Sequence, residues 1–255
     1  MAYRRVAALY DIHGNLPALE AVLAEMEALE PDLVVVGGDV VAGPLPGETL
    51  ERLVALGDRV QWVRGNADRE VVEAYDQGRP STAFSDQAAR ATMWTAEQVT
   101  RSQRDLLSSF EDRVTLEIEG LGPVLFCHGS PRSDEEIITS VTSDERLRAI
   151  LEGVAEPIVV CGHTHAQFER RVAGHLVVNA GSVGMPYEGD AAAFWLSLDP
   201  EVNLRRTDYD VDAGVELMRA TGYPDVDEML RESLLEPADP AWVAEYFEGR
   251  ATGAT

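Results

Sequence analysis

The first third of the chain alternates between short apolar runs and longer segments with helical spacing. The apolar runs at 5–10, 32–39 and 60–66 predict strands buried on both faces. Between them, 15–29 and 46–56 repeat apolar residues at helical spacing, and each has a proline in its first turn. This strand–helix–strand–helix–strand order predicts a parallel sheet with right-handed crossovers.

The remainder of the chain changes pattern twice. Residues 67–111 are polar with helical spacing, so we expect a helical excursion from the sheet. Residues 212–249 are helical and acidic, which is typical of a solvated face or of a dimer contact. No long linker divides the chain, so 1–255 is expected to form one domain of two sheets flanked by helices. Between the excursion and the acidic tail we expect a helix near 143–152 and strands at 113–118, 122–128, 157–165, 167–173, 175–179, 191–198 and 202–208.

Composition narrows the class of protein. The chain has 255 residues, 45% of them hydrophobic, which is enough for a sizeable core. A net charge of −24 opposes binding to duplex nucleic acid and to anionic membranes. Two cysteines are too few for a disulfide framework, and the N-terminal residues lack the apolar stretch of a signal peptide. We therefore expect a cytoplasmic protein.

Metal-ligating side chains follow five of the predicted strands. In open α/β sheets, ligands bind outside the carboxyl ends of the strands, so these side chains are expected to converge. Four of the five histidines of the chain belong to this set. The set comprises Asp11, His13, Asp39, Asn66, His128, His163 and His165.

The types of these side chains indicate the chemistry. Imidazole, carboxylate and amide groups without thiolate suit transition ions such as Mn, Fe, Co, Ni or Zn. Seven donors exceed the needs of one tetrahedral ion, and they suit two ions that share a carboxylate. In Asp11-x-His13 and His163-x-His165, the alternation of a strand would place both flanking side chains on one side. We expect Cys127 and Cys161 to be small buried residues beside the ligands rather than ligands themselves.

Five short motifs and their order resemble the calcineurin-like metallophosphoesterase superfamily, in particular its small bacterial phosphodiesterases and phosphatases. The stretch at 179–186 resembles the segment that follows Gly-His-Thr-His in those members. The resemblance extends from about residue 4 to 210. The motifs are "DIHGN" (11–15), "GGDVVAGP" (37–44), "GNAD" (65–68), "CHGSP" (127–131) and "GHTH" (162–165).

The resemblance implies an α+β fold, a four-layer α/β/β/α sandwich of two mixed β-sheets flanked by helices. It also implies two divalent or trivalent transition metal ions, drawn from Mn, Fe, Zn, Co or Ni, with Asp39 as the bridging ligand. Carried over by motif, the first ion would be held by Asp11, His13, Asp39 and His165. The second would be held by Asp39, Asn66, His128 and His163.

Two positions depart from the family pattern. Tyr10 stands where a serine usually precedes Asp-x-His. Ala67 stands where many members carry a histidine that protonates the leaving group, with the following aspartate supporting it. Small bacterial members often lack this histidine as well. The candidate catalytic residue is therefore Asp68, either acting through water or with no catalytic role.

Several side chains have two interpretations. Asn15 either orients a substrate phosphate or caps the helix that follows it. Arg132 either clamps a substrate phosphate or forms a surface salt bridge. Asn66 is a metal and substrate ligand or a turn residue. Trp94 and Tyr75 stack on a base or, as we favour, pack in the core.

These observations favour a binuclear metal-dependent phosphoesterase that cleaves phosphodiesters or activated phosphomonoesters with a metal-bridging hydroxide. The partner is then a small phosphorylated substrate, with no duplex nucleic acid, no membrane and a possible homo-oligomer. One alternative is a catalytically weak, metallophosphoesterase-like binding or scaffold protein, although such proteins usually lose metal ligands. The other is a hydrolase of nucleotides or dinucleoside polyphosphates.

Overall fold

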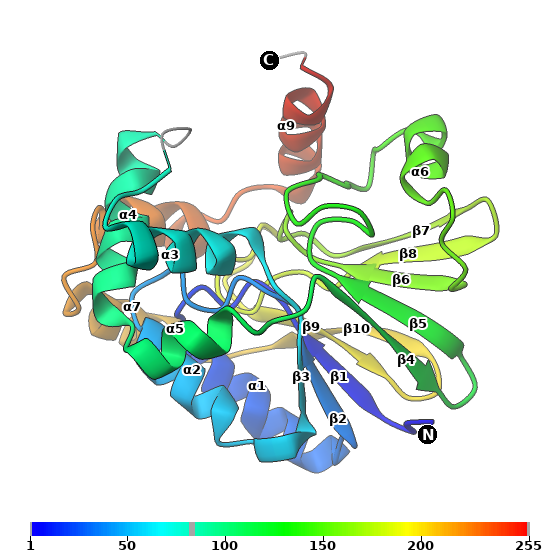
Figure 1. Ribbon diagram of the computed structural model, residues 1–255, viewed down its shortest axis with the longest axis horizontal. Coiled ribbons are helices and arrows are strands. Elements are labelled where there is room, and N and C mark those ends of the chain that lie inside the picture. Colours follow the sequence, from blue (N-terminus) through cyan, green and yellow to red (C-terminus); the bar gives the residue numbers. More distant parts are fainter. Residues whose placement is uncertain (1, 82–84, 254–255) are drawn as a thin grey trace.

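The computed structural model describes residues 2–81 and 85–253, and these build two mixed five-stranded sheets packed face to face with helices outside (Figure 1). The predicted four-layer α/β/β/α sandwich is therefore confirmed. The first sheet has the order β10-β9-β1-β2-β3, and the second has the order β4-β5-β6-β8-β7. The strands are β1 Val6–Leu9, β2 Leu33–Val36, β3 Val60–Trp62, β4 Arg113–Ile118, β5 Gly122–Cys127, β6 Ile158–Cys161, β7 Phe168–Val172, β8 His175–Asn179, β9 Ala193–Leu198 and β10 Val202–Thr207.

Each sheet has three parallel strands, and its other two strands are antiparallel to their neighbours. Strands β1, β2 and β3 run parallel, and β9 and β10 add an antiparallel hairpin on the β1 side. Strands β5, β6 and β8 also run parallel, with β4 and β7 antiparallel at the two edges. The parallel strands of both sheets thus direct their carboxyl ends to one edge of the sandwich, where the predicted ligands follow them.

Alternate residues of the central strands enter different cores. In β1, Ala7 and Leu9 face the helices, whereas Val6 and Ala8 face the second sheet. Burial on both faces explains why these strands are continuous apolar runs rather than alternating ones. A third core lies between the second sheet and helix α6 (Asp144–Ile150), where Leu147 packs.

The helices lie outside the two sheets and beyond their carboxyl ends (Figure 1). The predicted excursion at 67–111 contains α3, α4 and α5, and its residues 82–84 lie outside the described part of the chain. The predicted acidic tail contains α7, α8, η2 and α9. Among the described helices, none is long and apolar enough to cross a bilayer. The helices are α1 Leu16–Leu29, α2 Pro46–Val54, η1 Gly57–Arg59, α3 Asn66–Gln77, α4 Asp86–Gln98, α5 Arg101–Leu107, α6 Asp144–Ile150, α7 Val211–Arg219, α8 Val226–Leu230, η2 Arg231–Leu235 and α9 Pro240–Thr252.

Tyr10 lies between the two sheets, directly before the first ligand. Its ring is fully buried, and its hydroxyl donates to the carbonyl of Val160. A Cβ atom at Gly37 would lie 2.1 Å from this ring, and one at Gly162 would lie 2.5 Å from it. Glycine at these two positions therefore makes room for the tyrosine that replaces the usual serine of the family pattern.

Candidate metal centre

The predicted ligands lie in the loops that follow the strands, not on the strands themselves. Strand β1 ends at Leu9 and β6 ends at Cys161, so Asp-x-His and His-x-His both fall beyond the pleat. Strand alternation was therefore the wrong reason for side chains two residues apart to converge. The observed reason is a left-handed backbone, with φ of 52° at Asp11, 48° at His13, 66° at His163 and 58° at His165.

This backbone conformation indicates local strain. Non-glycine residues rarely adopt it, and such residues persist only where the surrounding structure holds them. Asp39, at φ 54°, shares it, so five of the seven predicted ligands are in this state. Strain of this kind concentrates at functional sites.

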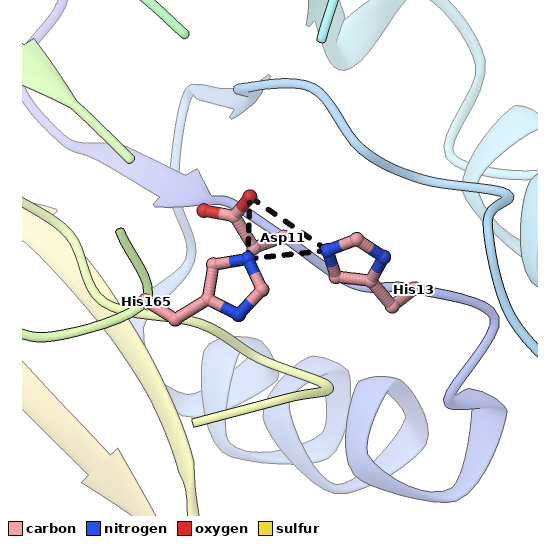
Figure 2. Close-up of side chains that lie close together, drawn as sticks. All are labelled: Asp11, His13 and His165. Carbon is pink, nitrogen blue, oxygen red and sulfur yellow. Dashed lines mark hydrogen bonds and ion pairs between the residues drawn. The ribbon is translucent and has the colours of Figure 1, made fainter. Parts of the chain in front are cut away.

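Asp11, His13 and His165 form the first group of possible ligands (Figure 2). The Nε2 atoms of His13 and His165 lie 3.2 Å apart. The Oδ1 atom of Asp11 lies 3.3 Å from Nε2 of His165 and 3.9 Å from Nε2 of His13. All three side chains are buried and point toward one another, although they come from the loops after β1 and β6.

Asp39, His128 and His163 form the second group, in which the possible ligand atoms lie within 4.8 Å of one another. The Oδ2 atom of Asp39 lies 3.4 Å from Nε2 of His128 and 3.8 Å from Nε2 of His13 in the first group. This oxygen therefore lies between the two groups, where a shared ligand belongs. His163 and His165 fall into different groups, as predicted from the His-x-His spacing.

Backbone carbonyls hold three of the imidazole rings from behind. The Nδ1 atom of His13 lies 2.9 Å from the carbonyl oxygen of Ala42, and that of His128 lies 2.9 Å from the oxygen of Gly37. The Nδ1 atom of His165 lies 2.8 Å from the oxygen of Met185. Because each Nδ1–H donates to its carbonyl, each ring is oriented with its Nε2 toward the cluster, as in metal-ligating histidines.

Buried polar atoms without partners test whether these residues fit metal ions. Among the described residues, six side-chain atoms are buried without a hydrogen-bond partner, and three of them belong to the predicted ligands: Oδ1 of Asp11, Oδ1 of Asn66 and Nε2 of His128. An unpartnered buried polar atom is costly, so it calls for an explanation such as a bound ion. The three atoms are of the kinds that transition ions accept, and all belong to the predicted set, so the residues fit the predicted ions.

The charges of the cluster also favour a cation. Burial opposes the charged form of His128, but Asp39 and Asp11 outweigh it and raise the pKa of His128 to about 10. Burial likewise opposes ionisation of Asp39, yet His128 and His13 hold the pKa of Asp39 far below its usual value. Burial and the neighbouring His128 lower the pKa of His163 to about 4. The carboxylates of Asp39 and Asp11, whose pKa values both lie below the usual range, thus draw positive charge to this point.

A sequence comparison identifies the family. Residues 5–199 match the model of the calcineurin-like phosphoesterase superfamily domain. The chain belongs to this superfamily. The resemblance in the five motifs is therefore confirmed over most of the chain.

The chain is also similar to other proteins over most of its length. A metallophosphoesterase from Sphaerobacter thermophilus is 28% identical, with a TM-score of 0.70 over 90% of this chain and 98% of that one. A hypothetical protein from Pyrococcus horikoshii is 21% identical and shares the fold, with a TM-score of 0.77 over 90% and 98%. An uncharacterized protein from Methanocaldococcus jannaschii is 26% identical over 85% of this chain and 92% of its own length.

Asp68, the predicted catalytic residue of this metallophosphoesterase, is fully buried behind Asp39. Its carboxylate accepts hydrogen bonds from the backbone N–H groups of Asp39 at 2.8 Å, Val40 at 2.9 Å and Gly65 at 3.2 Å. Burial and the charge of Asp39 raise the pKa of Asp68 to about 7. The contacts of Asp68 thus position the loop that carries Asp39, and a part in proton transfer stays a prediction.

Asn66 begins helix α3 directly beside the cluster. Its Nδ2 donates to Glu70 at 3.4 Å, while its Oδ1 is one of the unpartnered atoms. The backbone N–H of Ala67 donates to Oδ1 of Asp39 at 2.8 Å, so the start of α3 also orients the central carboxylate. The oxygen of Asn66 is therefore free for the ligand role predicted from the sequence.

The two other predicted substrate residues are bonded within the protein. Asn15 caps helix α1, because its Oδ1 accepts from Ala18 and its Nδ2 donates to the carbonyl of Gly184. Arg132 pairs with Glu136, with 2.7 Å between Nε and Oε2, and its guanidinium is half exposed. The structure thus shows the capping and salt-bridge alternatives, and a phosphate contact by either residue stays a prediction.

A segment after β8 supports the ligand loops, and the spacing of polar residues alone did not assign it a role. The hydroxyl of Ser182 donates to the carbonyl of Asp11 at 2.6 Å, and Nδ2 of Asn179 donates to that of Gly162 at 2.7 Å. A Cβ atom at Gly184 would lie 1.8 Å from the carbonyl oxygen of Ile12, so only glycine fits there. The family-like stretch at 179–186 was the sequence signal for this role.

The two ligand groups do not include the cysteines, His175 or the two aromatic residues. Cys127 and Cys161 are free thiols in the core between the second sheet and α6. His175 begins β8, and its Nδ1 lies 2.9 Å from the carbonyl oxygen of Glu156. Tyr75 packs against the first core as favoured, whereas Trp94 lines a cavity and makes an edge contact with Tyr223, with ring centroids 5.2 Å apart.

Proposed function

We propose that this chain is a binuclear metal-dependent phosphoesterase that hydrolyses phosphodiesters or activated phosphomonoesters. The observation that carries the proposal is the set of unpartnered buried ligand atoms in two adjoining groups. Its setting in a calcineurin-like phosphoesterase domain supports phosphoester hydrolysis over other metal-dependent reactions.

Each ion would have its own ligands, and one carboxylate would be shared. Asp11, His13 and His165 would hold the first ion, whereas Asn66, His128 and His163 would hold the second. Asp39 would serve both, because its Oδ2 lies within 3.8 Å of an imidazole nitrogen in each group. Such a pair of ions supplies a Lewis acid for the phosphoryl oxygens and lowers the pKa of bound water toward about 7.

The residues of the chain keep this centre in a fixed geometry. The carbonyls of Ala42, Gly37 and Met185 orient three imidazole rings, so the rings need little reorganisation when a substrate binds. Asp68 accepts from the backbone N–H of Asp39, and the N–H of Ala67 donates to the carboxylate of Asp39, so both the backbone and the side chain of this residue are held. Preorganised groups of this kind stabilise charge as it develops on the phosphoryl oxygens.

The leaving group receives no proton from position 67, because alanine has none to give. Loss of general-acid catalysis typically lowers rates by about 10²–10⁴-fold. The loss is smallest for leaving groups of low pKa, which depart as stable anions. We therefore expect nitrophenyl esters and diesters to be cleaved much faster than alkyl monoesters, and only with transition ions present.

Restoring the histidine of the family pattern tests this proposal. In Ala67→His, we expect kcat/KM for alkyl esters to rise by about tenfold or more, with little change for nitrophenyl esters. The measurement is the dependence of kcat/KM on leaving-group pKa, for a panel of mono- and diesters assayed with each metal in both proteins.

Controls of fold and metal content come first, because Ala67 is buried and the new ring adds bulk beside the ligands. If the fold and the metal content of Ala67→His are intact, an unchanged dependence of kcat/KM on leaving-group pKa would show that another group already protonates the leaving group. Absence of hydrolysis with every metal and ester of the panel would contradict the proposed function itself.

A further inference from the structure

A second cavity, of about 430 Å³, lies beside the metal centre at the C-terminal helix α9. Its walls come from α9, from the segment around η2 and from Tyr187. Its volume falls in the range of about 300–1,000 Å³ that is usual for small-molecule sites. Most of this wall follows residue 199, where the match to the family model ends.

Tyr187 connects this cavity to the first group of ligands. Its ring stacks on that of His165, with centroids 5.0 Å apart and planes inclined by 18°. Its backbone N–H also donates to the carbonyl of His165 at 3.1 Å. On the cavity side, the ring centroid of Phe247 lies 6.3 Å from that of Tyr187. One aromatic ring therefore separates the cavity from a metal ligand.

The wall formed by α9 presents flat aromatic surface. Trp242 and Tyr246, one helical turn apart, stack with centroids 5.3 Å apart and planes 10° from parallel. They nevertheless remain 60% and 42% exposed. Exposed aromatic rings next to a cavity are typical of a binding site rather than of a core.

Charged groups at the margin of the cavity are of both signs. Arg250 lies over the ring of Tyr246, with its Cζ 6.0 Å from the centroid, and among the described residues it has no carboxylate partner. Glu232 and Glu236 line the opposite part and pair with Arg231. The cavity thus combines a stacking surface, an available guanidinium and carboxylate acceptors.

Side-chain contacts near both ends of helix α9 hold this wall of the cavity in place. The carboxylate of Glu248 accepts from the hydroxyl of Thr142 at 2.7 Å and pairs with Arg146 at 2.8 Å. At the other end, Asp239 caps the first turn of the helix. The cavity is therefore preformed rather than dependent on a chance contact.

We propose that this cavity binds the nucleobase of a nucleotide phosphoester while its phosphate lies at the metal centre. The inference rests on the proposed function and names its substrate class. Every nucleobase has a flat π-face that stacks on tryptophan or tyrosine, and its ring or amino N–H groups, such as N3–H of thymine, donate to carboxylates. A lipid chain fits the same place poorly, because the charged groups of Arg250, Glu232 and Glu236 surround it.

A pair of substrates with one leaving group separates the cavity from the chemistry. Thymidine 5′-(p-nitrophenyl phosphate) carries a base, whereas methyl p-nitrophenyl phosphate has none, and both release nitrophenol. In Trp242→Ala we expect kcat/KM to fall by about tenfold or more for the thymidine ester and to stay unchanged for the methyl ester. The conservative variant Trp242→Phe should retain most of the wild-type value.

Binding of thymidine alone supplies a readout that needs no hydrolysis. We expect it to quench tryptophan fluorescence in the full-length protein and to bind Trp242→Ala about tenfold or more weakly by calorimetry. Ribose, which has no base, should bind neither protein. Trp94→Phe is the matched control, because Trp94 lies in a different cavity against Tyr223, and this variant should bind thymidine as the wild type does.

Three results would overturn the inference. These are equal thymidine binding by wild type and Trp242→Ala, an equal loss of activity on both esters, or a change of oligomeric state in Trp242→Ala with thymidine binding unaffected. The last would mean that the aromatic face contacts a second copy of the chain. Failure of both esters to react, with thymidine binding still dependent on Trp242, would contradict the proposed function and leave the base site standing.

Discussion

Replacing Asp39 with alanine is expected to lower the affinity for Mn²⁺ by more than about 100-fold and to abolish hydrolysis. Loss of a group that merely supports a ligand costs about 10–100-fold. Loss of the Asp39 side chain should lower the affinity further, because its Oδ2 lies within 3.8 Å of imidazole nitrogens in both groups. The variant also leaves the backbone N–H of Ala67 without its carboxylate acceptor.

Calorimetric titration of the wild type and of Asp39→Ala with Mn²⁺ measures this loss of affinity. The matched control is His175→Ala, which removes an imidazole from the start of β8, away from every ligand loop. Asp39→Asn keeps the shape of the side chain, so it separates loss of charge from loss of fold. Equal Mn²⁺ affinity in Asp39→Ala and His175→Ala would contradict the role given to Asp39.

Replacing Asp68 with alanine should lower the free energy of unfolding by about 3 kcal/mol or more and weaken metal binding as well. The change leaves three backbone N–H groups without their acceptor, those of Asp39, Val40 and Gly65. Each unsatisfied buried donor costs about 1–3 kcal/mol. The loop that carries Asp39, held at φ 54°, also loses its main support.

The readouts for Asp68 distinguish positioning from proton transfer. Denaturant unfolding gives the stability, and calorimetry gives the metal affinity. For a positioning residue, saturating metal should restore most of the activity of Asp68→Asn, and its pH–rate profile should keep the wild-type shape. Disappearance of one limb of that profile, with metal bound and fold intact, would instead identify Asp68 as a catalytic acid.

The fold was predictable because its strands are buried on both faces. Runs such as 32–39 and 157–165 contain the observed strands β2 and β6, although each strand ends before the polar residues that follow. Helix α1 begins one residue after Asn15, where the capping residue and the following proline predicted it. Turn and capping chemistry is local, so a sequence reveals it well.

The convergence of the candidate ligands was predictable from the sequence, but the contacts that support their loops were not. The carboxyl ends of parallel strands meet at one edge of a sheet. Asp11 and His165 could therefore be placed together although they are 154 positions apart in the sequence. The left-handed backbone of the ligand loops depends on contacts such as Ser182 to Asp11, made between distant segments. Likewise, the ion pair between Arg132 and Glu136 depends on the rotamers of the two side chains, which no sequence pattern predicts.

Anomalous scattering from crystals reconstituted with Mn²⁺ would show directly whether two ions bind in adjoining groups that share Asp39. We expect two anomalous peaks per chain, one among Asp11, His13 and His165 and the other among Asn66, His128 and His163, with Asp39 next to both. A single peak in a crystal of active protein, or two peaks away from these residues, would rule out a binuclear centre at this position.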